Sequence, residues 1–235
     1  MRSPIQTRFD DLPETLPVFP LSGALLLPWG RLPLNIFEPR YLNLVLDSLK
    51  TGRLFGMVQP DYDKADREKS DTNPKVTRLH AEPAVYSVGC VGRVSSLEET
   101  EDDRLLITLR GLSRFRIMSE AEGLKGYRRF NVSYEEFKDD MEPLEKFDLD
   151  LDRDALMERL RPYLEAQSMR INIDAIKGLS ETTLITSLCM ICPFDPREKQ
   201  ALLEAPSIAS RAETLTALLR MGAFESGGKP EGPPQ

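Results

Sequence analysis

The sequence predicts an α+β chain in which strands come first and helices follow. Between residues 13 and 140, short apolar or alternating segments are separated by turn-forming residues, a pattern typical of a barrel or sandwich. After residue 150 the apolar residues recur with helical spacing, and an acidic stretch near 140–150 separates the two parts. We therefore expect a β-rich unit over 13–140, a helical unit over 150–222 and a disordered tail over 223–235.

Composition and charge narrow the classes of function. The 235 residues include 31 Lys and Arg against 38 Asp and Glu, a net charge of −7 that disfavours nucleic acid as the main partner. No apolar run approaches the roughly 18 residues that a membrane span needs, and the first residues lack the apolar core of a signal peptide. The three cysteines are widely placed and predict no disulfide framework. We expect a cytoplasmic protein without membrane contact.

The strands of the first unit are expected at 16–21, 31–37, 54–60, 84–97, 105–109, 114–118 and 127–137. Pro33 lacks an N–H for the ladder and therefore places 31–37 at a sheet edge or a bend. Gly111 is expected to break the apolar region into the strands 105–109 and 114–118. The polar segment 61–75 is expected to be a loop.

Phe37, Glu38, Pro39, Arg40 and Tyr41 stand where a predicted strand feeds a predicted helix. Pro39 suits the first helical position, where a missing N–H costs nothing, and the Glu38 carboxylate complements the positive end of the helix. Arg40 can pair with Glu38 or with a carboxylate on a neighbouring strand. We interpret this signature as architectural and expect Glu38→Ala to destabilise the fold by about 0.5–2 kcal/mol.

Four helices are predicted from apolar stripes at Leu42, Val45, Leu46 and Leu49; Leu156, Leu160, Tyr163 and Leu164; Leu184, Leu188, Ile191 and Cys192; and Ile208, Ala212, Leu215 and Leu219. Ser180 is expected to cap the third helix, which Pro193 ends. Asp195 and Glu198 form an expected capping box at the start of a further helix, over 195–205. Pro162 is expected to kink the second helix, and Gly222 to end the last one.

Residues suited to catalysis or metal binding are few. His80 is the sole histidine and has no nucleophile motif nearby. Cys189 and Cys192 form a C-x-x-C motif, but it falls at the C-terminal end of a predicted helix, where the dipole opposes a thiolate. A zinc site would need Cys90, Cys189, Cys192 and His80 to converge without the usual ligand spacing. We therefore predict no catalytic residue, no metal and no cofactor.

Two glycines and several arginines of the β-rich unit are candidate binding elements. The segment "GCVGRV" has Gly89 and Gly92 three residues apart within strand patterning, which favours a bulge or close backbone approach over a phosphate cradle. The arginines on or beside strands could bind RNA or an acidic peptide, or could form a solvated face paired with carboxylates; they are Arg104, Arg110, Arg114, Arg116, Arg128 and Arg129, with Phe115, Tyr127 and Phe130 among them.

A run of large apolar residues lies next to Pro28 and Gly30. It belongs either to the core, which we favour, or to an apolar patch or groove. In the second case its members would contact polypeptide; they are Leu25, Leu26, Leu27 and Trp29.

Several motifs in order resemble one known family. The stretch "LPVFPLSGALLLPWGRLPLNIFEPRYLNLV" resembles the opening of the N-terminal, substrate-binding domain of Lon proteases. "FGMV", "GCVGRV" and "LLITLRGLSRFRI" follow in the same order, and the helical half is similar down to "LITSLCMICPFDPREKQALLEA" and "RAETLTALL". The resemblance covers about residues 13 to 221.

The resemblance implies a PUA-like β pseudo-barrel followed by a helical bundle, as in stand-alone Lon substrate-binding-domain proteins of bacteria. A full Lon protease has in addition an ATPase module with a P-loop and a Ser-Lys peptidase domain, and this chain shows neither motif. We therefore expect a non-enzymatic module that binds unfolded or extended polypeptide, with a protease or chaperone as a further partner class.

Two other functions remain open. The first alternative is an RNA- or nucleotide-binding protein that uses the PUA-like sheet and its arginines, although the net charge disfavours it. The second is an enzyme or small-molecule binder with a site between the two halves.

Overall fold

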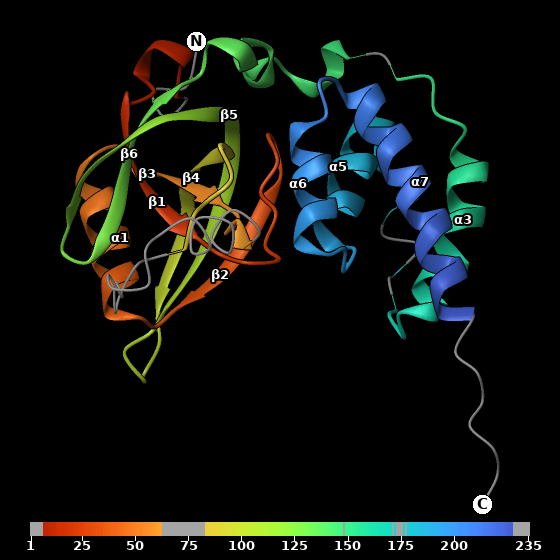
Figure 1. Cartoon of the computed structure of the whole chain (residues 1–235), viewed down its shortest axis with the longest axis horizontal. Coiled ribbons are helices and arrows are strands. Elements are labelled where there is room, and N and C mark those ends of the chain that lie inside the picture. Colours follow the sequence, from red (N-terminus) through yellow and green to blue (C-terminus); the bar gives the residue numbers. More distant parts are fainter. Residues whose placement is uncertain are drawn as a thin grey trace, which may run out of the picture. The chain divides into compact units, whose positions relative to one another are not determined.

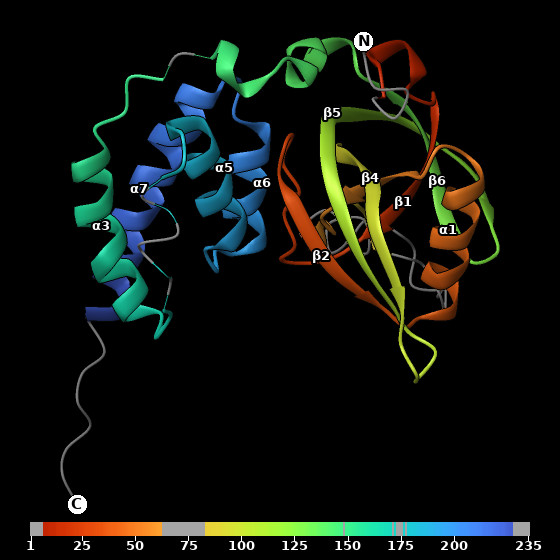
Figure 2. The ribbon, with the colours of Figure 1, turned by 180° about the vertical axis from the view of Figure 1, so that it is seen from behind.

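The computed structural model describes residues 7–62, 83–147, 149–170, 172, 176 and 178–227. His80 and most of the expected 61–75 loop lie outside the described residues. Contacts divide the chain into two units, Met1–Glu142 and Pro143–Gln235. Figures 1 and 2 show that the first unit is built mainly of strands and the second of helices, as expected for an α+β chain.

The first unit contains a mixed six-stranded sheet with the order β2-β5-β4-β3-β1-β6 (Figure 1). Its strands are β1 (Thr15–Pro20), β2 (Arg31–Ile36), β3 (Leu54–Val58), β4 (Val88–Glu99), β5 (Leu105–Leu124) and β6 (Tyr127–Ser133). β1 and β3 are parallel, and the other pairs are antiparallel. β5 also pairs with β6, so β5, β4, β3, β1 and β6 close a ring, and β2 lies outside it as an edge strand on β5. The edge position of Pro33 was predicted correctly.

β5 is one continuous strand, so the expected break at Gly111 is wrong. An ideal Cβ on Gly111 would lie 2.0 Å from the carbonyl oxygen of Leu27. The Gly111 carbonyl accepts a 3.0 Å hydrogen bond from the Trp29 amide, and the Gly111 amide donates one of 2.9 Å to Gly30. The glycine thus allows the chain before β2 to approach the strand closely, and it does not interrupt the ladder.

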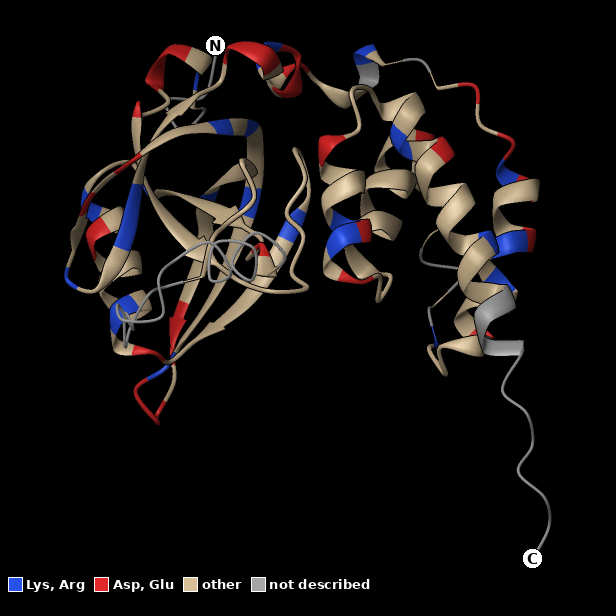
Figure 3. Cartoon of the chain, in the orientation of Figure 1, with Lys and Arg blue, Asp and Glu red and all other residues tan. Residues whose placement is uncertain are grey.

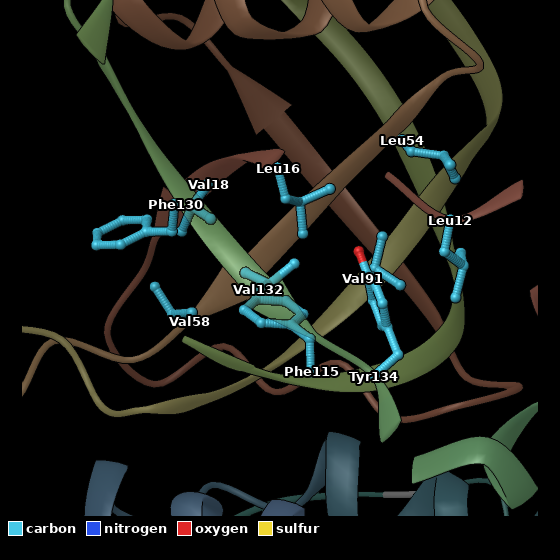
Figure 4. Close-up of a cluster of buried hydrophobic side chains, with 10 residues drawn as sticks. All are labelled: Leu12, Leu16, Val18, Leu54, Val58, Val91, Phe115, Phe130, Val132 and Tyr134. Atoms are coloured by element: carbon cyan, nitrogen blue, oxygen red, sulfur yellow. The ribbon is translucent and has the colours of Figure 1, made fainter. Parts of the chain in front are cut away.

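The hydrophobic core of the strand unit lies inside the ring (Figure 4). It is formed by Leu12, Leu16, Val18, Leu54, Val58, Val91, Phe115, Phe130, Val132 and Tyr134. Gly89 faces this cluster, because an ideal Cβ there would lie 2.5 Å from the Phe115 ring. Gly92 lies beside a register shift after Val91, where its own Cβ would meet Leu26 at 2.8 Å. Both glycines are therefore sites of close packing in β4.

The helix α1 (Pro39–Lys50) packs against β1, β3 and β6. Its buried residues are Tyr41, Leu44, Val45 and Ser48. The buried face of the helix therefore lies about one residue away from the predicted stripe. Leu46, a member of that stripe, is 48% exposed. The buried face includes Tyr41 because its ring stacks on Phe19, with 4.0 Å between the ring centroids.

The second unit consists of α3 (Arg153–Ala166), α5 (Glu181–Ile191), α6 (Pro196–Glu204) and α7 (Ile208–Gly227), preceded by the short 3-10 helix η3 (Leu144–Lys146). α7 contacts each of α3, α5 and α6. The Ser180 cap is confirmed, since its hydroxyl accepts from the Thr183 amide. The Asp195–Glu198 capping box is also confirmed, with both of its hydrogen bonds at 2.8 Å.

Three predictions about the helical unit are wrong in detail. α7 continues past Gly222 to Gly227, so residues 223–227 do not belong to a tail, and 228–235 lie outside the described residues. A Cβ at Gly222 would lie 2.6 Å from the Tyr163 ring, so this glycine makes room for an aromatic side chain within the helix. Ile191 is 48% exposed and does not belong to the buried stripe of α5.

Candidate binding pocket beside Trp29

A pocket of about 470 Å³ opens in the strand unit. Its walls come from the start of the described chain, the chain before β2, the turn before β3, the middle of β4 and β5, and η2 (Glu135–Met141). The lining residues are Thr7, Trp29, Arg53, Arg93, Val94, Ser95, Arg110, Gly111, Leu112 and Met141. The volume lies within the range of roughly 300–1,000 Å³ that is common for ligand pockets. The pocket is therefore the candidate site of this unit.

Trp29 is held at the pocket in an unusual backbone conformation. Its φ angle is +66°, in the left-handed region that bulky residues rarely adopt. Two hydrogen bonds fix it: its amide donates to Gly111, and its indole Nε1 donates to the Asp140 carbonyl at 2.9 Å. The Arg110 guanidinium lies 5.0 Å from its ring centroid, a cation–π distance. Backbone strain of this kind costs about 1–3 kcal/mol and is common at binding sites.

The strand register brings three arginines together across the sheet. Arg110 of β5 lies opposite Arg93 of β4 on one side and opposite Arg31 of β2 on the other. Directly opposed residues share a face, and like charges in such pairs are destabilising. Arg53 adds a further positive charge at the pocket. The sheet thus concentrates cationic side chains where their mutual repulsion must be offset.

Behind the pocket, η2 is tied to β5 by a buried ion pair. Arg114 donates to both oxygens of the Asp140 carboxylate at 2.8 Å, and the two side chains are 7% and 10% exposed. The expected strand 127–137 ends at Ser133, and η2 follows it. The strand ends before Phe137 because the Phe137 ring packs against the Arg114 guanidinium and is buried there. The guanidinium carbon lies 4.6 Å from the ring centroid.

The other arginines considered in the sequence are largely paired. Arg116 forms a bidentate pair with Glu136, and Arg128 forms one with Glu120 across β5 and β6. Arg104 pairs with Asp102 at 2.7 Å. Phe115, Tyr127 and Phe130 are buried and offer no aromatic surface. This arrangement matches the alternative of a solvated face paired with carboxylates.

The four residues of the apolar run have different surroundings. Leu25, Leu26 and Leu27 are at most 2% exposed, so they form core and cannot supply an exposed contact surface in this structure. Trp29 is half-buried and is the member of the run that lines the pocket.

The signature at the start of α1 lies outside the pocket lining. Arg40 donates to Glu38 at 3.1 Å, one of the two pairings expected. The Glu38 side chain makes no capping hydrogen bond, and Pro39 begins the helix. Phe37 is 61% exposed, whereas Tyr41 is buried. Apart from Phe37, these residues shape the strand-to-helix corner.

The family of the chain can be stated at this point. A family profile described as the substrate-binding domain of ATP-dependent protease La (LON) matches residues 15–221. The chain belongs to the Lon substrate-binding-domain family. The match is confined to that domain and does not extend to the catalytic domains of Lon proteases.

Relatives and solved structures agree with this assignment. The chain is 24% identical over 213 residues to Lon protease 2 of Myxococcus xanthus and 29% identical over 214 residues to Lon protease 2 of Sorangium cellulosum. These alignments cover 89% and 88% of the chain but only 24% of each relative, so the chain spans about a quarter of their length.

Two solved structures share the fold of this Lon-type domain. A Lon N-terminal domain protein from Xanthomonas campestris is 25% identical, with a TM-score of 0.55, over 86% of this chain and 97% of that one. The N-terminal domain of the Mycobacterium avium complex Lon protease has a TM-score of 0.51 at 14% identity, covering 87% and 97%, which shows similarity of fold alone.

The three cysteines of this Lon-type domain are buried, and none of them forms a disulfide. Burial raises the pKa of Cys189 and of Cys192 to about 12, so neither forms a thiolate readily. Within the described residues no group of three or more His, Cys, Asp or Glu side chains could hold a metal ion. In the same part of the chain no helix is long and apolar enough to cross a membrane.

Among the arginines that line the pocket of the Lon-type domain, the sequence singled out Arg110 but not Arg53 or Arg93. A signal for Arg93 was present, because "GR" at 92–93 and "RG" at 110–111 place arginine beside glycine in both strands. Pairing the two glycines in antiparallel register brings Arg93 opposite Arg110, as observed. No local pattern marks Arg53, which reaches the pocket through the turn between α1 and β3.

Proposed function

We propose that this chain is a non-catalytic module that binds unfolded or extended polypeptide through the pocket beside Trp29. The pocket itself carries the proposal. Its wall combines an aromatic ring and the apolar side chains of Leu112 and Met141 with cationic groups, a mixture suited to side chains and backbone of a peptide. The description of the matched family as a substrate-binding domain supports the same function.

The proposal extends to the fold and the setting of the protein. The closed ring of strands supports a PUA-like pseudo-barrel, and the contacts of α7 with α3, α5 and α6 support a helical bundle, as two domains near 13–140 and 150–222. Three buried cysteines outside any disulfide fit a reducing cytoplasm. A protease or chaperone is the proposed further partner, by analogy with Lon proteases.

The test is a titration with unfolded, tryptophan-free peptides. Trp29 is the sole tryptophan, so its emission reports on the pocket, and the anisotropy of a labelled peptide reports on binding. We expect saturable binding accompanied by a shift of the Trp29 emission. Binding without that shift would move the site elsewhere on the chain, and absence of binding for every peptide would refute the proposal.

RNA or nucleotide binding is a second candidate, favoured by the row of Arg31, Arg110 and Arg93. Phosphate contacts make binding strongly dependent on salt. An RNA oligonucleotide that binds at low salt and is released at moderate salt would favour this candidate. Peptide binding that changes little over the same salt range would favour the first.

A further inference from the structure

The arginines at the pocket determine which polypeptide segments fit it best. We propose that the Trp29 pocket recognises an acidic residue next to an apolar one in extended polypeptide, with the glutamate or aspartate carboxylate bound by Arg53 and Arg110 and the apolar side chain inside the pocket. This inference rests on the proposed polypeptide-binding function and names the class of segment that the site selects.

Positively charged side chains gather at the lining of the pocket. Arg53, Arg93 and Arg110 line the pocket, and no aspartate or glutamate among the described residues does. Within the same residues neither Arg53 nor Arg110 forms an ion pair. The Arg110 guanidinium instead lies over the Trp29 ring in a cation–π contact. The arginines elsewhere on the sheet are paired with carboxylates; they are Arg104, Arg114, Arg116 and Arg128. In a chain of net charge −7, this local excess matches an anionic ligand.

The geometry of the arginines suits a carboxylate. The planar guanidinium group presents paired N–H donors that match the two oxygens of a carboxylate. Stacking on Trp29 orients Arg110, which lowers the entropy lost when it binds.

The apolar part of the wall adds a second requirement. Trp29, Leu112 and Met141 lie within the same pocket as the arginines. A carboxylate alone would leave this surface in water, whereas an aliphatic or aromatic neighbour on the peptide would cover it. The preferred segment therefore carries an acidic residue next to an apolar one.

The surrounding charges favour a peptide over a nucleic acid. Met141 belongs to η2, which also carries Glu135, Glu136, Asp139 and Asp140, and Thr7 leads into the acidic 3-10 helix η1 (Phe9–Asp11). Figure 3 shows acidic residues on both short helices. A continuous phosphate backbone would be repelled beyond the pocket, but a single carboxylate with neutral neighbours would not.

The test compares two tryptophan-free peptides that differ only in one position, glutamate or glutamine, next to a leucine. Their binding is measured by anisotropy at moderate salt, and Trp29 emission locates it. We expect the glutamate peptide to bind about tenfold more tightly, the change typical for one charge-assisted hydrogen bond. Arg53→Gln and Arg110→Gln should each remove most of that preference. Arg220→Gln, an exposed position on α7 with the same change in charge, should leave it intact.

The possible results separate the inference from the proposed function. Equal binding of both peptides, unaffected by the two arginine variants, would overturn the acidic preference and leave polypeptide binding in place. No binding of either peptide would overturn both. Displacement of the peptide by an RNA oligonucleotide at moderate salt would overturn the inference in favour of a phosphate site. Thermal melting of each variant checks that a lost preference does not reflect unfolding.

Discussion

The indole N–H of Trp29 donates a 2.9 Å hydrogen bond to the carbonyl oxygen of Asp140. The side chain of the same aspartate accepts from Arg114 of β5. One residue of η2 thus connects the chain before β2 to β5. The position of Trp29 depends on this connection, because its backbone conformation is unfavourable on its own.

The buried pair behind the pocket gives the first prediction. Arg114→Met leaves the Asp140 carboxylate buried without its partner, and we expect the free energy of unfolding to fall by about 3–5 kcal/mol. Arg116→Met is the matched control, because its pair with Glu136 is exposed and is worth less than about 1 kcal/mol. Urea unfolding measures both. Equal losses in the two variants would show that burial gives the Arg114 pair no extra weight.

The close approach at Gly111 gives the second prediction. A methyl group there would overlap the Leu27 carbonyl, so Gly111→Ala should force the chain before β2 away from β5 and destabilise the unit by at least about 2 kcal/mol. Gly178→Ala, where nothing lies within 4 Å of the new methyl group, should change stability by less than about 1 kcal/mol. Thermal melting of the two variants tests this; a stable Gly111→Ala with unchanged Trp29 emission would contradict it.

The structure at the start of α1 predicts a smaller loss of stability for Glu38→Ala than the sequence did. Glu38 makes no capping hydrogen bond and pairs with Arg40 at an exposed position, so Glu38→Ala should cost less than about 1 kcal/mol. Asp195→Ala removes a true capping box and should cost about 1–2 kcal/mol. Chemical denaturation of both variants gives the comparison, and a larger loss for Glu38→Ala would restore the original expectation.

Asp47 of α1 should make stability depend on acidic pH. Hydrogen bonds from Lys125, and then from Lys50, lower its pKa from 3.8 to about 2 in the folded protein. Because the pKa of Asp47 is lower in the folded than in the unfolded protein, its charged carboxylate stabilises the fold at pH values above about 4. This stabilisation is lost as the pH falls from about 4 towards 2. Asp47→Asn should therefore flatten the decline of the melting temperature over that interval. Carboxyl NMR titration of the wild type and of Lys125→Met, which should raise the pKa of Asp47, tests the assigned cause.

The buried thiols give the last prediction. Cys90, Cys189 and Cys192 should resist a thiol reagent at neutral pH in the folded protein and should react rapidly in denaturant, because all three are buried and the last two have raised pKa values. Fast reaction of two thiols in the folded state would instead support redox chemistry at the C-x-x-C motif.

The sequence was informative where local patterns decide structure. The Asp195 capping box, the Ser180 cap and the edge position of Pro33 each follow from the chemistry of a few neighbouring residues. The stripe of α1 and the end of α7 could not be predicted in this way. Tyr41 is buried because its ring stacks on Phe19. Gly222 lies within a helix because the Tyr163 ring fills the space that a side chain at this position would take. Both effects depend on partners distant in the sequence.

The pocket was predicted less well than the fold. Trp29 was singled out as part of an apolar run, yet the three leucines before it belong to the core. Arg110 was noted among strand arginines, but its neighbours Arg93 and Arg53 come from other strands and turns. Only the register of β4 on β5 shows that they meet, and a bulge shifts that register at Gly92.

Closure of the ring has a consequence for synthesis of the chain. β1 leaves the ribosome before β6, one of its two strand partners, and the Thr15 hydroxyl donates to Asn131, 116 residues later. Until β6 has been translated, β1 has β3 alone beside it, and Leu16 and Val18 lack the partner residues that cover them. A nascent or truncated chain that stops before residue 133 thus exposes an unpaired strand edge and apolar side chains, the features that chaperones bind and that cause aggregation.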